Sequence, residues 1–95
     1  MVIKHGGFIH AVAFAHDGAL VATGGNDRIV RVWNATTGEL VQTLEGHEDA
    51  VLSATFSPDD RWLLSSSYDG TARLWDVASG STLAVLQAHS WWVWQ

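Results

Sequence analysis

The chain has no cysteine, only one proline, few basic residues and no long apolar run among its 95 residues. Without cysteine it can form neither a disulfide nor a thiolate zinc site, so the residues do not indicate a redox compartment. No apolar stretch approaches the roughly 20 residues that a transmembrane helix needs, and no basic segment leads into an apolar one as in a secretory signal. We therefore expect a cytoplasmic protein.

Positive charge is also scarce. Five Lys and Arg residues stand against ten Asp and Glu residues, which gives a formal net charge of −5. The basic residues are scattered over positions 4, 28, 31, 61 and 73. Nucleic-acid binders usually carry a basic stripe, and an acidic surface is repelled by anionic membranes. We expect neither nucleic acid nor a membrane among the partners.

Apolar residues make up 47% of the chain, which is typical of a globular domain, although a core of this size is marginal. Nine glycines indicate many turns. Six tryptophans are unusual in so short a chain, and Trp91, Trp92 and Trp94 stand within its last five residues.

An internal repeat organises the sequence. His5, His47 and His89 follow one another at intervals of 42 residues, and no gap is needed to align the two copies. At the same offset the copies share the pairs Phe14 and Phe56, Asp17 and Asp59, Asp27 and Asp69, Arg31 and Arg73, Trp33 and Trp75, Gly38 and Gly80, and Leu44 and Leu86.

Each copy reads as four short strands separated by turns, because β-branched and aromatic residues alternate or cluster between turn-forming residues. The predicted strands are residues 8–14, 20–24, 28–34 and 39–44, then 50–56, 62–66, 71–77 and 81–86. Gly18 in the first copy and Asp60 in the second tolerate a positive φ in the first turn. Gly38 and Gly80 suit a bulged hairpin. We predict an all-β fold.

A four-strand unit repeating every 40 to 45 residues with "GH" and "WD" motifs resembles the WD-repeat (WD40) β-propeller family. "GH" is intact at Gly46–His47 and "WD" at Trp75–Asp76, whereas the first copy has Lys4–His5 and Trp33–Asn34. The resemblance covers nearly the whole chain. It implies one blade at 1–46, a second at 47–88, and the start of a third repeat at 89–95.

The resemblance further implies one hydrogen-bonded set of four side chains in each blade. These sets are His5, Thr23, Asp27 and Trp33, and His47, Ser65, Asp69 and Trp75. Their chemistry is compatible, because an indole N–H only donates, a carboxylate only accepts, and hydroxyl and imidazole can do both. Histidine, serine and aspartate together also suggest a catalytic triad. The set recurs in the same phase in both copies, which favours a structural role and a protein that is not an enzyme.

The family binds proteins or peptides near the entrance of the inner strands. By position this implies a partner-binding surface of Phe8, His10, Asn26, Ala50, Leu52 and Tyr68. The alternative is that Phe8 and Leu52 only cover the core. No phosphate loop, metal cluster or nucleophile motif indicates a cofactor, and one histidine per blade is too dispersed for a metal site.

Two blades do not close a propeller, which needs roughly four to eight. Two complementary open faces make a head-to-tail interface that generates a ring. We therefore predict a cyclic homo-oligomer, with a tetramer of eight blades favoured and a trimer of six as runner-up. A purely structural repeat unit and a fragment of a longer propeller are alternatives. In such a ring, copies of His10 near the axis could share a metal or anion.

The tail 89–95 aligns with the start of an inner strand. In a ring of copies, residues 8–14 of the next subunit already fill that slot. We expect residues 8–14 to keep it and the tryptophans of the tail to pack on the ring surface, in the channel mouth or against other tails. In the alternative, the tail takes the slot and expels the neighbour's first strand.

Overall fold

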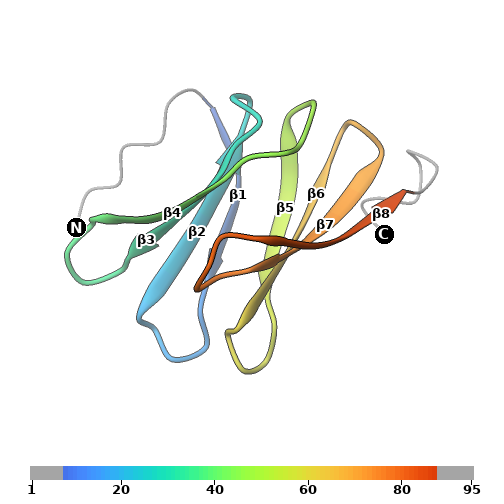
Figure 1. Cartoon of the computed structure of the whole chain (residues 1–95). Coiled ribbons are helices and arrows are strands. Elements are labelled where there is room, and N and C mark those ends of the chain that lie inside the picture. The colour runs from blue at the N-terminus through green and yellow to red at the C-terminus, as the bar shows by residue number, and fades with distance from the viewer. Residues whose placement is uncertain (1–7, 88–95) are drawn as a thin grey trace.

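Two antiparallel sheets of four strands each make up the fold (Figure 1). The computed structural model describes residues 8–87. Blade 1 contains β1 (Ile9–Phe14), β2 (Leu20–Gly25), β3 (Val30–Asn34) and β4 (Leu40–Leu44). Blade 2 contains β5 (Val51–Phe56), β6 (Trp62–Ser67), β7 (Thr71–Asp76) and β8 (Thr82–Gln87). These bounds confirm the predicted all-β fold and differ from the predicted strands by at most two residues.

In each blade the strands follow one another as a meander, in the order β1-β2-β3-β4 and β5-β6-β7-β8. The turns therefore gather at two ends of the molecule (Figure 1). We call the end with segments 26–29, 45–50 and 68–70 the upper end. The end with turns 15–19, 35–39, 57–61 and 77–81 is the lower end. The predicted partner-binding residues belong to the upper end.

The first turn of each blade requires a left-handed residue. Gly18 has a φ of 77° and Asp60, 42 residues later, has a φ of 63°, as the sequence predicted. Glycine adopts this conformation freely, and aspartate is among the few side chains that tolerate it. The second copy therefore gains a carboxylate at a position where the first copy has no side chain.

The two blades pack face to face, with β5 of blade 2 against β1 and β2 of blade 1. The core at this junction contains Phe56, Leu63 and Trp75 from blade 2, together with small and branched residues of blade 1 such as Ala22 and Val32. Gly24 is required there, because a Cβ at this position would lie 2.6 Å from Cγ1 of Val51. The close approach of the sheets therefore depends on residues that have small side chains or none.

Two polar contacts at the lower end also join the blades, and we call them the junction clips. The Asp60 carboxylate accepts hydrogen bonds from the backbone N–H of His16 at 2.8 Å and of Asp17 at 3.1 Å, and its Oδ1 lies 2.8 Å from Nδ1 of His16. These bonds to His16 and Asp17 hold the pKa of Asp60 below its usual value. In the second clip, Nε2 of Gln42 donates to the carbonyl of Ala78 at 2.9 Å.

Each blade has one further face that no other described residue covers. Phe56 is 3% exposed at the junction, whereas Phe14, its equivalent in blade 1, is 64% exposed. On the other side, Leu44 is fully buried at the junction, whereas its equivalent Leu86 is 56% exposed. Among residues 8–87, two apolar faces thus stay uncovered at the two ends of the blade pair.

The described residues form no helix that could cross a membrane.

Candidate partner-binding surface and the network beneath it

A hydrogen-bonded chain of side chains lies inside blade 2 and ends below the upper surface. The indole N–H of Trp75 donates to Oγ of Ser65 at 2.8 Å, and this oxygen lies 2.6 Å from Nε2 of His47. Nδ1 of His47 lies 3.2 Å from Oδ2 of Asp69. Because the indole can only donate and the carboxylate only accepts, the pattern assigns the imidazole proton to Nδ1 and the Ser65 proton to the bond with His47. The four residues implied by the family resemblance are thus in contact.

Asp69 anchors the turn between β6 and β7. Its carboxylate accepts hydrogen bonds from the backbone N–H of Glu48 at 2.8 Å and from the N–H and hydroxyl of Thr71 at 2.8 and 2.5 Å. The Thr71 hydroxyl also lies 3.3 Å from Nδ1 of His47. Thr71 is a member that the sequence analysis missed, and a hydroxyl two residues after the turn aspartate was its only signal. These bonds link the entry of β5 to the turn that carries Tyr68.

The network sets the protonation state of both ionisable members. Burial lowers the pKa of His47 from 6.5, although Asp69 beside it acts in the opposite direction. Burial alone would raise the pKa of Asp69, but hydrogen bonds from Thr71, Glu48 and His47 outweigh it and lower the pKa to about 2. Near neutral pH the folded blade therefore contains a neutral imidazole and an ionised carboxylate.

Ser65, His47 and Asp69 have the order of contacts found in a catalytic triad. The surroundings oppose a reaction at this serine. Ser65 is fully buried, and its oxygen accepts the indole N–H of Trp75. A nucleophile must reach its substrate, and no substrate atom can approach this oxygen. The geometry is that of a buried hydrogen-bond network that holds neighbouring strands together.

Blade 1 repeats part of this arrangement. The indole N–H of Trp33 donates to Oγ1 of Thr23 at 2.8 Å. Asp27 accepts from the N–H of Ile29 at 3.2 Å and pairs with Nη1 of Arg31 at 2.5 Å. His5, the fourth predicted member, lies outside the described residues, as does the tail 89–95.

The upper end presents two exposed aromatic side chains, one from each blade. Phe8 is 75% exposed and Tyr68 is 60% exposed. Equivalent backbone bonds position them, because the N–H of Asn26 donates to the carbonyl of Phe8 at 3.0 Å and the N–H of Tyr68 to that of Ala50 at 3.0 Å. Large, exposed aromatic residues are frequent anchors of protein interfaces.

The other predicted surface residues differ in how much they expose. His10 and Asn26 are exposed and in contact, with Nε2 of His10 2.5 Å from Oδ1 of Asn26. Leu52 is half-buried, and Ala50 is buried, so its methyl group offers almost no surface to a partner. Within residues 8–87 no group of three or more His, Asp or Glu residues could hold a metal ion.

Comparison with known proteins identifies the family. The family model described as "WD domain, G-beta repeat" matches residues 2–34 and 38–76, which is most of the chain. The chain is a WD40 repeat protein. The two four-stranded meanders and the repeat seen in the sequence are thus those of WD40 repeats.

Similar WD40 proteins come from Dictyostelium discoideum and from rice. Protein tipD of Dictyostelium discoideum is 40% identical over 65 residues, which is 68% of this chain and 11% of tipD. Small ribosomal subunit protein RACK1z of rice (Oryza sativa subsp. japonica) is 35% identical over 65 residues, which is 68% of this chain and 19% of RACK1z. This WD40 chain therefore spans between a tenth and a fifth of the length of such relatives.

A solved structure extends the likeness to three dimensions. "Structure of U3-55K" matches 90% of this chain with a TM-score of 0.86 and 29% sequence identity, and the match covers 26% of that chain. "Crystal structure of RRP9 WD40 repeats" matches with the same values. The two blades therefore superpose on about a quarter of a larger WD40 domain.

Proposed function

We propose that this WD40 chain forms part of a closed propeller that binds a protein or peptide at its upper end and has no enzymatic activity. The observation that carries the proposal is the pair of aromatic side chains, Phe8 and Tyr68, exposed at one end above a rigid network. The full burial of Ser65 supports a binding role over a catalytic one. The length of the relatives supports a larger propeller.

Peptide selection tests the binding surface. Peptides selected from a display library against the chain are measured with wild type, Tyr68→Ala and Leu83→Ala. Leu83 is an exposed apolar residue of β8 and serves as the control. An aromatic anchor is worth about 2 kcal/mol, so Tyr68→Ala should weaken binding about 30-fold. Leu83→Ala should leave it unchanged. Equal affinity for all three proteins would refute the upper-end surface.

Copies of this chain are a second candidate for the blades that complete the ring. The favouring observation is that the open faces repeat the residues of the buried junction, with Phe14 in place of Phe56 and Leu86 in place of Leu44. Four copies would give eight blades and three copies would give six. The junction between copies would lack both clips, because Gly18 stands where Asp60 is needed and Ala84 where Gln42 is needed, so this ring would have weaker joints than the blade pair.

Mass in solution separates the two ways of closing the ring. Light scattering at micromolar concentration should give a tetramer, or a trimer, if copies complete the propeller. A stable, folded monomer would exclude closure by copies and would leave additional, non-identical blades as the completion. The peptide measurement is independent of this result, because both upper-end aromatic residues belong to one chain.

A further inference from the structure

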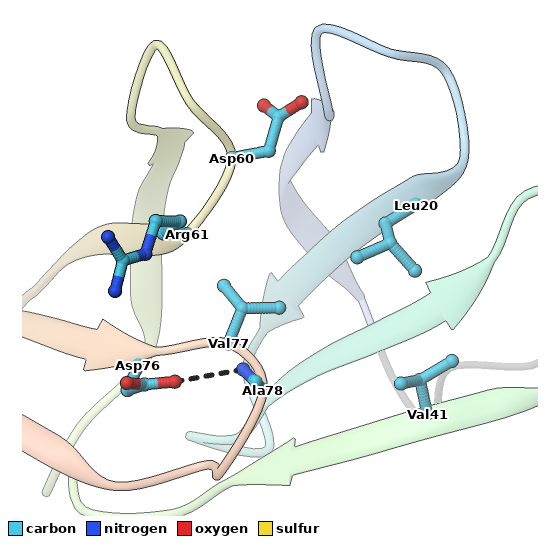
Figure 2. A pocket seen from close by; sticks show the side chains of 7 residues that line it. All are labelled: Leu20, Val41, Asp60, Arg61, Asp76, Val77 and Ala78. Carbon is cyan, nitrogen blue, oxygen red and sulfur yellow. Dashed lines mark hydrogen bonds between the residues drawn. The ribbon is translucent and has the colours of Figure 1, made fainter.

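A pocket opens at the lower end, on the opposite side of the molecule from the upper-end surface. It lies between the blades and has a volume of about 350 Å³ (Figure 2). Leu20 and Val41 of blade 1 and Val77 and Ala78 of blade 2 supply its apolar walls. Val77 is buried, whereas Val41 is 48% exposed at the pocket mouth. The volume suits one or two aliphatic side chains rather than a large ligand.

Two acidic residues, Asp60 and Asp76, are among those that line this pocket beside its apolar walls. Asp60 is held by the junction clip to His16. Oδ1 of Asp76 accepts the backbone N–H of Ala78 at 3.0 Å (Figure 2). It also accepts the N–H of Ser79 at 3.2 Å, and the two bonds fix the orientation of the carboxylate. Fixed charges beside an apolar pocket favour a ligand with matching charges next to an aliphatic group.

The wider lower end has the same sign of charge. Its turns and strand ends contain five carboxylates, those of Asp17, Glu39, Asp59, Asp60 and Asp76. Arg61, which lines the pocket, is the one Lys or Arg residue in these segments. An anionic ligand would meet a repulsive field, and a cationic one would be attracted.

We propose that this pocket is a second binding site, for a basic peptide segment in which an aliphatic side chain is flanked by arginine or lysine. The aliphatic group enters between Val41 and Val77, and the flanking cations lie against Asp76 and Asp60. The site is formed by the two blades of one chain alone. It therefore goes beyond the upper-end surface and does not depend on how the ring is closed.

Three short peptides with blocked termini serve as probes, with the full chain as receptor. ARLRA combines both features, AELEA reverses the charge, and ARGRA removes the aliphatic side chain. Titration calorimetry at low ionic strength should give the highest affinity for ARLRA. The affinity should fall when salt is raised, because rim charges are screened. An affinity for AELEA equal to that for ARLRA would refute the proposal.

Variants at the mouth locate the site. Val41→Lys places a cation in the pocket and should weaken ARLRA binding at least tenfold. Its matched control is Leu83→Lys at the equivalent position of blade 2, which has the same 48% exposure and should change the affinity less than twofold. Equal effects of the two variants would place the peptide elsewhere and overturn the assignment.

A charge-only variant completes the test. Asp76→Asn keeps the turn, because Asn34 at the equivalent position of blade 1 caps its own turn through Oδ1 at 2.8 and 3.0 Å. It should weaken ARLRA binding about twofold to fivefold, the effect of one exposed charge pair. Glu48→Gln removes one charge at the upper end and should have no effect. An unchanged affinity in Asp76→Asn with an unchanged melting temperature would refute the role of the carboxylate.

Discussion

Phe14 and Phe56 stand at the same place in two blades, but among the described residues a neighbouring blade covers only Phe56. Phe56 is 3% exposed and Phe14 is 64% exposed. For a phenylalanine of about 200 Å², this difference corresponds to about 120 Å² of surface. At about 25 cal/mol per Å², a covering blade would stabilise Phe14 by about 3 kcal/mol.

The two alanine variants measure this difference directly. Phe56→Ala leaves a cavity at the junction and should lower the free energy of unfolding by about 3–5 kcal/mol. Phe14→Ala removes an exposed ring and should cost less than about 1 kcal/mol in a chain that is not associated. The assay is urea denaturation followed by tryptophan fluorescence, over a hundredfold range of protein concentration.

The concentration range decides what covers Phe14. At the lowest concentration the two costs should differ by at least about 2 kcal/mol, given the area above. Costs that agree within 1 kcal/mol at that concentration would mean that Phe14 is not open, and the reasoning would fail. A cost for Phe14→Ala that grows with concentration would identify copies of the chain as the covering blades.

Three further predictions concern the network and the junction. Trp75→Phe leaves the buried oxygen of Ser65 without its indole donor, so it should lower the stability measured by thermal unfolding by about 1–3 kcal/mol. Peptides selected for the upper end should still bind this variant. Loss of peptide binding without loss of stability would contradict the structural role of Trp75. Acid should weaken the fold in two steps, because the unfolded chain binds protons more readily than the folded chain at both His47 and Asp69. Stability falls first as pH drops below 6.5, where His47 of the unfolded chain titrates. It falls again from about pH 4 to about pH 2, as Asp69 is protonated. Asp69→Asn should reduce the second step without abolishing it, because the pKa values of Asp59 and Asp60 are also lowered in the folded chain; an unchanged step in the variant would assign it to those carboxylates alone. Asp60→Gly keeps the left-handed turn but removes the first junction clip, so amide hydrogen exchange should accelerate in β5 more than in β8; equal acceleration would mean that the clip does not hold the blades together.

The repeat explains why so much of the fold could be predicted from the sequence. A 42-residue period aligns two copies without a gap, so each strand and each of the four predicted network positions was visible twice. The positive φ of Asp60 was predictable because Gly18 occupies the same phase. The contacts of Trp75, Ser65 and His47 were implied by the resemblance to WD40 repeats, and the donors and acceptors of these side chains are compatible with them.

Features that break the repeat were not predictable. The bond between His16 and Asp60 joins two different phases, so comparing the copies cannot reveal it. Phe8 is exposed, whereas Ala50 at the equivalent position is buried, because its methyl group does not extend beyond the surrounding backbone as a phenyl ring does. The lower-end pocket likewise depends on how far apart the two sheets lie, which is a property of packing and not of either copy.

The junction clips give the two repeats a fixed order. The carboxylate of Asp60 in blade 2 accepts a hydrogen bond from His16 in blade 1, and the side chain of Gln42 in blade 1 donates one to Ala78 in blade 2. If the repeats were exchanged, Pro58 would stand where His16 donates its backbone N–H, Gly18 would replace the carboxylate, and Ala84 would replace Gln42. The same two blades in reverse order would meet through apolar contacts alone. Engineering that treats WD40 repeats as interchangeable modules would therefore lose stability at this joint without altering either blade.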